Sequence, residues 1–355
     1  MNWPTLKFGG KEARIPIIQG GMGIGVSGPC LAGAVANAGG IGIISGAQIG
    51  YQEADFRTCT KEANRRGLHK AVEKARKISP QGIIGINFLT AMTHYNEMVQ
   101  EAVKAKVDLI ISGAGLPLDL PQWVKDTQTS LMPIVSSLKA AKVILKKWDR
   151  DFDYTPDGII VEGHRAGGHL GFDYEALLNP PADYFEQMVK GLKELTGAYE
   201  IKYKKKIQLI LAGGFYGGRE LKQALEWGAD GVQMASRFVA TEECDAHPLF
   251  KEAYIKAKEA DITLIKSPVG MPGRALMNDF VQRTLKGPVP VNRCYHCLKT
   301  CQPNTTPYCI TEALIRAVQG DVKEGLIFAG AEVHRIEKIS PVDKLIEEIL
   351  REAEA

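Results

Sequence analysis

Eight short apolar runs, separated by longer amphipathic stretches, dominate the pattern of hydrophobic and polar positions along the chain. Each run is rich in Ile, Val and Leu without clean alternation, as expected of a strand buried on both faces of a parallel sheet. Most gaps between the runs are long enough for a helix that crosses back over the sheet. The predicted strands are residues 15–19, 41–45, 83–88, 107–113, 131–137, 158–163, 208–214 and 231–236.

Several of the intervening stretches carry apolar residues at helical spacing, and residues 28–38, 54–77, 95–106 and 184–195 are predicted to be helices. Eight strand–helix units in series form either a closed barrel or an open, doubly wound sheet. Glycine clusters follow four of the predicted strands, and only in a barrel would these positions converge on one face. The pattern therefore favours an α/β fold of the (β/α)8 TIM-barrel type.

Two segments depart from this repeat. Residues 149–157 are predicted to be a surface insertion before the sixth strand. Residues 264–309 are rich in Gly, Pro and polar side chains and contain four cysteines, which predicts an insertion or lid. Residues 312–320 and 341–355 are predicted to be helices that pack back on the barrel. We thus expect residues 1–263 and 310–355 to form the barrel with a C-terminal helical closure.

Two loops carry the features of a phosphate-binding site. Ala212, Gly213 and Gly214 follow the seventh predicted strand, and residues 234–236 follow the eighth. TIM barrels commonly hold a phosphate between these two loops. Glycine lets the backbone approach an anion, and free N–H groups can then bind it. One Gly-Gly pair would more often only end a strand, but two loops at these positions predict a phosphate site.

The loop after the sixth predicted strand contains two histidines. His169 follows Ala-Gly-Gly on the expected active face, where an imidazole can carry out general acid–base chemistry near neutral pH. The five-residue offset from His164 differs from the spacing of a helical metal pair, and no carboxylate is clearly placed to complete a site. We therefore expect His169 to be catalytic and do not expect these histidines to bind a metal.

Residues 16–23 (Pro-Ile-Ile-Gln-Gly-Gly-Met-Gly) and 166–171 (Ala-Gly-Gly-His-Leu-Gly) resemble motifs of the nitronate monooxygenase (2-nitropropane dioxygenase) family. The FMN-dependent enoyl-acyl-carrier-protein reductase II is a close relative that shares them. Residues 85–88, 112–115, 231–238, 246–248 and 320–322 extend the resemblance over nearly the whole chain. The resemblance implies FMN as the cofactor and a homodimer as the usual form. One departure concerns the substrate, since Arg165 stands where the family usually has an acidic residue.

The resemblance also implies roles for individual residues. His169 matches the family's active-site histidine, and Gln19 would lie close to the flavin ring. The residues implied to bind FMN are Gln19, Gly20, Gly21, Met22, Gly23, Asn87, Gly113, Gly115, Glu162, Gly167, Gly168, Ala212, Gly213, Gly214, Met234, Ala235 and Ser236.

Two flavin activities share these residues. The first expectation is the oxidation of a nitronate to a carbonyl compound and nitrite with O2, with His169 as acid or base. The alternative is an enoyl reductase that passes hydride from NAD(P)H through FMN to the alkene of an acyl-carrier-protein or CoA thioester. A non-redox phosphate-binding barrel and a flavin-free scaffold are disfavoured, because the glycine loops and His169 would all lie on one face.

Cys294, Cys297, Cys301 and Cys309 lie within sixteen residues and outside the usual pattern of either relative. Zinc sites usually pair two separate C-x2-C knuckles, whereas a tight run with a final outlier is more typical of iron–sulfur ligation. The spacing also resembles that of the 2,4-dienoyl-CoA reductase group, where a comparable cluster follows an FMN barrel. We expect a 4Fe–4S cluster, with structural zinc as the alternative.

Charge and composition limit the kinds of partner that the protein can bind. The 44 basic and 41 acidic residues leave a formal net charge of +3, which argues against a nucleic-acid or anionic-membrane surface. No stretch approaches the roughly 18 apolar residues of a membrane helix, and the first residues lack a charged-then-apolar signal pattern. A small-molecule substrate and a cytoplasmic location are therefore expected.

Overall fold

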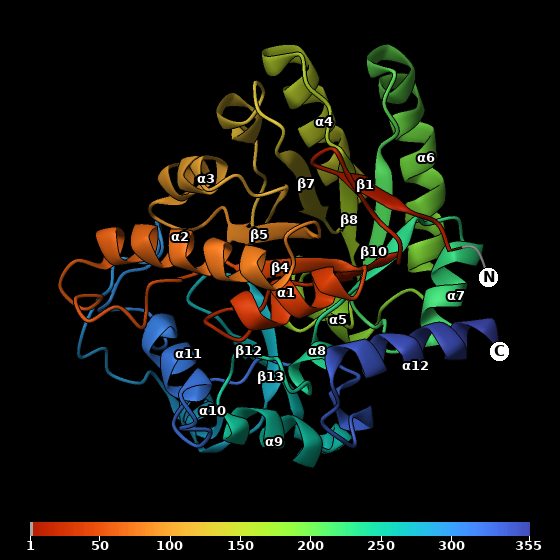
Figure 1. Ribbon diagram of the computed structural model, residues 1–355. Coiled ribbons are helices and arrows are strands. Elements are labelled where there is room, and N and C mark those ends of the chain that lie inside the picture. The colour runs from red at the N-terminus through yellow and green to blue at the C-terminus, as the bar shows by residue number, and fades with distance from the viewer. Residues whose placement is uncertain (1–2) are drawn as a thin grey trace.

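The computed structural model describes residues 3–355. Its barrel strands are β3 (Ile17–Gln19), β4 (Ile41–Ser45), β5 (Ile83–Leu89), β6 (Leu109–Gly113), β7 (Ser130–Val135), β8 (Gly158–Glu162), β10 (Gln208–Ala212) and β11 (Gly231–Met234). These strands form a closed barrel in the order β10-β11-β3-β4-β5-β6-β7-β8, and the pairs are parallel. Each corresponds to one of the predicted strands, so the prediction of a (β/α)8 barrel is confirmed (Figure 1).

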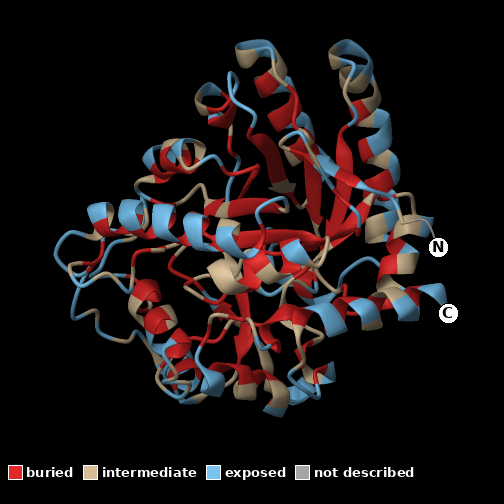
Figure 2. Cartoon of the chain, in the orientation of Figure 1, coloured by how far each residue is buried: buried red, intermediate tan, exposed pale blue. Residues whose placement is uncertain are grey.

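The barrel interior is filled by apolar side chains from the strands. Ile18, Ile43, Leu109, Ile160 and Ile210 are fully buried there. Their neighbours along each strand point outward to a second core beneath the helices, so every strand is buried on both faces. This arrangement explains why the runs are continuously apolar, and Figure 2 shows the strands as the most buried part of the chain.

An N-terminal hairpin closes one end of the barrel. Its strands, β1 (Leu6–Phe8) and β2 (Lys11–Ala13), are antiparallel, and Leu6 and Phe8 belong to the interior core. The N–H of Gly9 donates to the Ser130 hydroxyl at 2.9 Å, at the start of β7. The hairpin therefore covers the end where the strands begin, which leaves a site only at the opposite end.

Helices surround the barrel with one buried and one exposed face (Figure 2). They are α1 (Pro29–Asn37), α2 (Thr60–Ile78), α3 (Tyr95–Lys104), η1 (Leu120–Trp123), α4 (Leu138–Phe152), α5 (Tyr174–Leu178), α6 (Tyr184–Tyr203), α7 (Gly218–Glu226) and α8 (Ser236–Val239). The four helices predicted before residue 200 are confirmed, with different ends. No helix in the described part of the chain is long and apolar enough to cross a membrane.

The insertion predicted at residues 149–157 is wrong at its start, because α4 continues to Phe152. Its apolar stripe of Ala141, Ile144, Leu145 and Trp148 is buried at helical spacing. The charged residues that follow belong to the last turn of this helix and lie towards solvent. Asp153, in the left-handed region at φ 48°, then ends the helix.

After the barrel, the chain forms an additional layer. It contains α9 (Pro248–Lys256), η2 (Glu259–Asp261), β12 (Ile262–Lys266), β13 (Pro272–Leu276), α10 (Asp279–Lys286), α11 (Ile310–Val318), η3 (Val333–Arg335) and α12 (Val342–Glu354). The predicted C-terminal helices correspond to α11 and α12. Helix α12 packs on α7 and α1 (Figure 1).

Residues 264–309 are more ordered than their composition suggests. Strand β13 pairs with β12 on one side and with β9 (Gly168–His169), in the loop after β8, on the other, which gives a three-stranded antiparallel sheet. Ile265, Ala275, Phe280 and Tyr308 form a small core of their own. The segment is thus attached to the barrel at the strand that carries His169.

Candidate functional site

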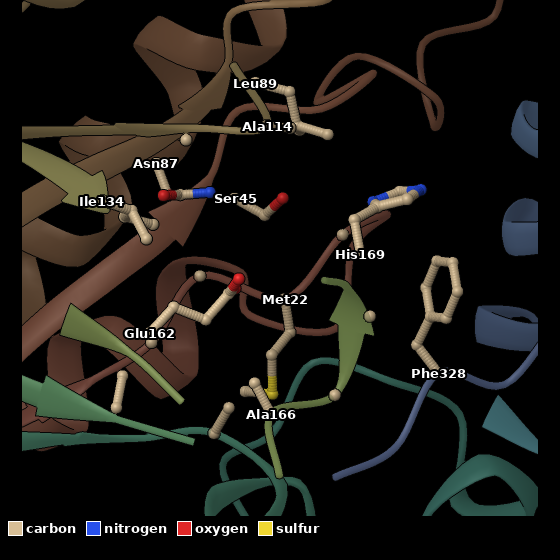
Figure 3. Close-up of a pocket in the computed structure, with 18 of the residues that line it drawn as sticks. Met22, Ser45, Asn87, Leu89, Ala114, Ile134, Glu162, Ala166, His169 and Phe328 are labelled. Carbon is tan, nitrogen blue, oxygen red and sulfur yellow. The ribbon is translucent and has the colours of Figure 1, made fainter. Parts of the chain in front are cut away.

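A cavity of about 450 Å³ lies where the barrel strands end. Figure 3 shows side chains from several strand ends directed into it, including Asn87, Glu162 and His169. Of the residues predicted to form the site, the cavity is lined by Gly20, Gly21, Met22, Gly23, Asn87, Gly113, Gly115, Glu162, Gly167, Gly168, His169, Ala212, Gly213, Gly214, Ala235 and Ser236. The structure thus brings together segments that lie more than 200 residues apart in the sequence.

Gln19 and Met234, also predicted to bind the cofactor, do not line the cavity. The Gln19 side chain accepts the Ile43 N–H at 3.1 Å and donates to the Ile43 carbonyl at 3.2 Å, so its amide joins β3 to β4. Met234 packs in the core beneath the helices. Both residues end strands that support the site.

The loops after β10 and β11 have backbone groups that can hold an anion. Gly213 and Gly214 lie at φ 90° and 110°, where side chains are strained, and a Cβ on Gly213 would lie 2.7 Å from the Gly163 carbonyl oxygen. Within residues 3–355, the N–H groups of Gly213, Gly214 and Ala235 donate to no acceptor. Unpaired N–H groups at the cavity wall are suited to phosphate oxygens.

His169 is held in place by residues far along the chain. Its Nε2 is 2.8 Å from the Ser267 hydroxyl, and its ring meets Phe328 at a centroid distance of 5.0 Å (Figure 3). Desolvation lowers the pKa of His169 to about 4, so the imidazole is neutral at neutral pH. A neutral imidazole with a fixed orientation can accept a proton at the cavity wall and, once protonated, give it up again.

Ser267 is a site residue that sequence reasoning missed. It lies just after β12, in a segment interpreted as an insertion, and its contact with His169 depends on the pairing of β13 with β9. Neither strand alternates clearly enough to predict this antiparallel pairing. No local pattern around Ser267 could have identified it.

Glu162 ends β8 with its carboxyl group directed into the cavity (Figure 3). The carboxylate accepts the Gly171 N–H at 2.8 Å and the Ser136 hydroxyl at 3.2 Å. Desolvation nevertheless raises the pKa of Glu162 to about 7, against the opposing effect of these two donors. Part of the Glu162 population is therefore protonated at neutral pH.

The part of the cavity wall that residues 269–328 contribute is largely apolar. Its lining residues include Val269, Met271, Leu298, Ile310, Leu314, Leu326 and Phe328, together with Cys297 and Thr311. The lining also includes two arginines, and each is ion-paired: Arg165 with Glu332, and Arg237 with Glu348. The lining residues in the described chain therefore include no Lys or Arg without a carboxylate partner.

The sequence profile described as nitronate monooxygenase matches residues 9–352. The chain belongs to the nitronate monooxygenase family. This family member is thus an oxidoreductase, as predicted. It is 28% identical over 289 residues to a probable nitronate monooxygenase of Staphylococcus aureus, covering 75% of this chain and 76% of that one. FabK from Thermotoga maritima has a similar structure, with a TM-score of 0.71, 28% identity and coverage of 96% and 93%.

A second kind of relative acts on a CoA compound. The (3aS,4S,5R,7aS)-5-hydroxy-7a-methyl-1-oxo-octahydro-1H-indene-4-carboxyl-CoA dehydrogenase of Rhodococcus jostii is 28% identical over 266 residues, which are 75% of this chain. The match spans 64% of that protein's length and 66% of its Mycobacterium tuberculosis counterpart. The chain thus spans only about two thirds of the length of these dehydrogenases.

The structure does not support the predicted metal-ion site at the four clustered cysteines. Among residues 3–355, no three His, Cys, Asp or Glu side chains are arranged to hold a metal ion. Cys294 is exposed, whereas Cys297, Cys301 and Cys309 are half-buried, and all four are free thiols. Only Cys297 of the four lines the cavity.

The raised pKa of Glu162 predicts how the stability of a Glu162→Gln variant depends on pH. Between the ordinary value of 4.5 and about 7, the folded protein keeps a proton that the unfolded chain has lost. The stability contributed by this group is therefore complete below pH 4.5 and falls as pH rises through 7. Glutamine can still accept the Gly171 N–H but cannot ionise, so this loss should disappear.

The measurement is urea unfolding of both proteins between pH 4 and pH 8. We expect the stability of Glu162→Gln, relative to the parent protein, to increase as pH rises from about 4.5 to 7. His169, whose lowered pKa has the opposite effect on stability, is present in both proteins and cancels in the difference. A difference that stays constant across this range would show that Glu162 titrates normally.

Proposed function

We propose that this protein is an FMN-dependent reductase of enoyl thioesters, carried by CoA or an acyl-carrier protein, with NAD(P)H as electron donor. The observation that carries the proposal is the largely apolar cavity wall that residues 269–328 contribute, together with the ion pairing of both lining arginines. A nitronate is a small anion and would need an unpaired cation or several donors there, because burying an unpaired charge is costly. An uncharged acyl chain fits this wall.

Nitronate oxidation, expected first from the sequence, becomes the second candidate. The family's name and the S. aureus relative favour it. Two other similarities favour a thioester: the name of the R. jostii relative contains CoA, and the sequence resembles enoyl-acyl-carrier-protein reductase II. The two candidates differ in the charge of the group that reacts, an anionic nitronate or an uncharged enoyl chain, which makes them separable by experiment.

The residues at the strand ends fit FMN. The unpaired N–H groups of Gly213, Gly214 and Ala235 would bind its single phosphate, as the glycine geometry of these loops allows. Asn87, the first glycine loop and the turn at Gly113 would surround its ring system. When bound, FMN supplies two-electron hydride chemistry. The residues of this chain then have to bind, orient and protonate the substrate.

His169 has the position for the proton-transfer step. Reduction of an enoyl thioester adds a hydride to one alkene carbon and a proton to the other, which lies next to the thioester carbonyl. We assign delivery of this proton to His169, whose neutral imidazole would first take up a proton from solvent and return to the neutral form when it passes that proton on; Ser267 would hold the ring in orientation. The apolar wall would keep water away from the reacting carbon.

An anaerobic titration tests the proposed substrate and donor. We expect NADH or NADPH to reduce the bound flavin and a short enoyl-CoA, such as crotonyl-CoA, to reoxidise it. The nitronate of 2-nitropropane should reduce the flavin at least about tenfold more slowly than the pyridine nucleotide, because both arginines that line the cavity are ion-paired. Rapid reduction by the nitronate, with nitrite formed in air and no reoxidation by crotonyl-CoA, would replace this proposal with the second candidate.

The phosphate position predicts the effect of Gly214→Val. A Cβ at this residue would lie 3.2 Å from the Cβ of Arg165, and φ 110° is strained for valine. We expect FMN affinity to fall by at least about tenfold, or about 1.4 kcal/mol. Gly197→Val is the matched control, because Gly197 has open space around it on α6. Flavin fluorescence titration measures both variants, and equal affinities would contradict the assignment.

The role of His169 predicts a separation of binding from turnover. His169→Ala should keep its FMN yet lose about 10²–10⁴-fold in turnover, the usual contribution of a general acid. His164→Ala serves as control, since His164 stacks on Phe172 at 3.9 Å and does not line the cavity. Steady-state kinetics with the substrate found above measures both. If turnover survives in His169→Ala but not in His164→Ala, His164 would be the acid–base residue instead.

A further inference from the structure

Gln48 is a polar side chain of the cavity wall to which the proposed mechanism assigns no role. It lies three residues beyond Ser45, the end of β4, and is only 6% exposed. Its φ of 47° lies in the left-handed region, which residues other than glycine rarely adopt. Residues held in such strained conformations cluster at functional sites. The loop thus holds the Gln48 side chain at the cavity in a conformation that glycine would adopt more easily.

Two hydrogen bonds fix which end of the Gln48 amide faces the cavity. The Gly50 N–H, which can only donate, donates to Asn64 Oδ1 at 2.9 Å. The other end of the Asn64 amide is therefore its NH2 group, which donates to Gln48 Oε1 at 2.9 Å. The Gln48 oxygen is thus occupied by α2, and Nε2 is the end that remains.

The Gln48 Nε2 group is an unpaired donor at the cavity. Among residues 3–355 it has no hydrogen-bond acceptor, and the fully enclosed unpaired side-chain atoms there belong to Trp123, Thr155 and Arg237. Nε2 therefore borders open space, and because Gln48 lines the cavity, that space is the cavity. A ligand that excludes water from this donor without offering an acceptor would lose free energy. The site thus favours a ligand with an acceptor oxygen at this point.

Helix α2 makes the arrangement rigid. A Cβ on Gly50 would collide with the Ala63 carbonyl group, so the loop and the helix are in direct backbone contact. Asn64 follows Ala63 in α2 and is itself buried. The Tyr51 N–H donates to the Gln48 backbone carbonyl at 3.0 Å and closes the turn. The donor is therefore preorganised and needs little rearrangement to meet an acceptor.

The surroundings of Gln48 indicate which part of the cavity it serves. Ala47, the preceding residue, lines the cavity and packs against the same small apolar cluster as Leu314. Leu314 belongs to the largely apolar part of the wall, and His169 adjoins that part through its ring contact with Phe328. Gln48 and His169 thus both border the wall to which the acyl chain is assigned.

Reduction of an enoyl thioester, the reaction proposed above, develops charge on one oxygen. As hydride adds to the far alkene carbon, the electron pair of the double bond moves towards the thioester carbonyl, whose oxygen becomes negative. The proton from His169 then bonds to the carbon next to the carbonyl, and the C=O double bond forms again. A fixed N–H donor at this oxygen stabilises the transition state more than the ground state.

We propose that Gln48 is a catalytic residue whose Nε2 donates to the thioester carbonyl oxygen, and that Asn64 is a positioning residue that turns this donor towards the cavity. The inference rests on the proposed reductase function. A single uncharged donor suits a carbonyl oxygen, whereas a nitronate, with two oxygens and a full charge, would need several donors.

Stopped-flow measurement of the two half-reactions in the FMN-loaded full chain tests the role of Gln48. We expect Gln48→Ala to bind FMN and to be reduced by NADH or NADPH like the parent protein. Its reoxidation by crotonyl-CoA should slow by about 10²–10³-fold, the usual loss when an oxyanion donor is removed. Gln52→Ala is the matched control and should react at the parent rate, because Gln52 lies nearby in the chain, is exposed and does not line the cavity.

The orientation of the amide gives a second test. Asn64→Asp still accepts the Gly50 N–H, but as a carboxylate it can no longer donate to Gln48. The Gln48 amide should then rotate, so that Nε2 bonds the new carboxylate and Oε1 faces the cavity. At pH 8 we expect reoxidation in Asn64→Asp to be slower than in Asn64→Ala, where the amide is free to turn. A purely structural role predicts the reverse order, because aspartate preserves the shape and the Gly50 hydrogen bond.

Four outcomes would overturn the inference. Equal reoxidation rates in Gln48→Ala and the parent protein would exclude the donor role while the reductase function stands. A loss of FMN affinity in Gln48→Ala as large as the loss in reoxidation rate would place the donor on the flavin. Faster reoxidation in Asn64→Asp than in Asn64→Ala would reduce Asn64 to a structural residue. If crotonyl-CoA fails to reoxidise even the parent protein, the proposed function itself is wrong and the inference falls with it.

Discussion

The pairing of β11 with β3 is the constraint on which the rest of the structure depends. Val232 lies opposite Ile17 and Met234 opposite Gln19, so the last barrel strand returns to the first. Once eight parallel strands close, all their C-terminal ends form one ring. The loops that leave this ring have to turn sharply, which explains the glycines there. Closure thereby brings backbone N–H groups, Glu162 and His169 to one cavity.

The chemistry of the cavity depends on a second, weaker connection. Strand β9 carries His169 and pairs with β13, whose chain position is about a hundred residues later. That pairing brings Ser267 to the imidazole and covers the cavity with apolar side chains. The resulting desolvation acts oppositely on the two groups: it keeps His169 neutral and favours the proton on Glu162. In both cases the apolar site stabilises the uncharged form of the side chain.

The barrel and much of its site could be predicted because their signals are local. A strand buried on both faces is apolar throughout, and a loop that needs positive φ contains glycine, so both can be recognised in a few adjacent residues. Long-range pairings leave no such signal, and Ser267, β12 and β13 were missed for this reason. The end of α4 was misplaced because charged residues in an outer helical turn resemble a loop. Gln19 was predicted to bind the flavin because of its place in the motif, but its side chain bonds Ile43 and joins β3 to β4.

Arg165 shows how the structure changes the meaning of a departure from the family pattern. On the sequence, a basic residue in place of an acidic one leaves the substrate in question. In the structure, Arg165 pairs with Glu332, and the Ala331 N–H donates to its carbonyl at 3.0 Å. Glu332 lies in a distant part of the chain and also pairs with Arg335, so two arginines share its carboxylate. Because Arg165 is already paired, it adds no anion site, so the departure is compatible with a substrate whose reacting acyl group is uncharged.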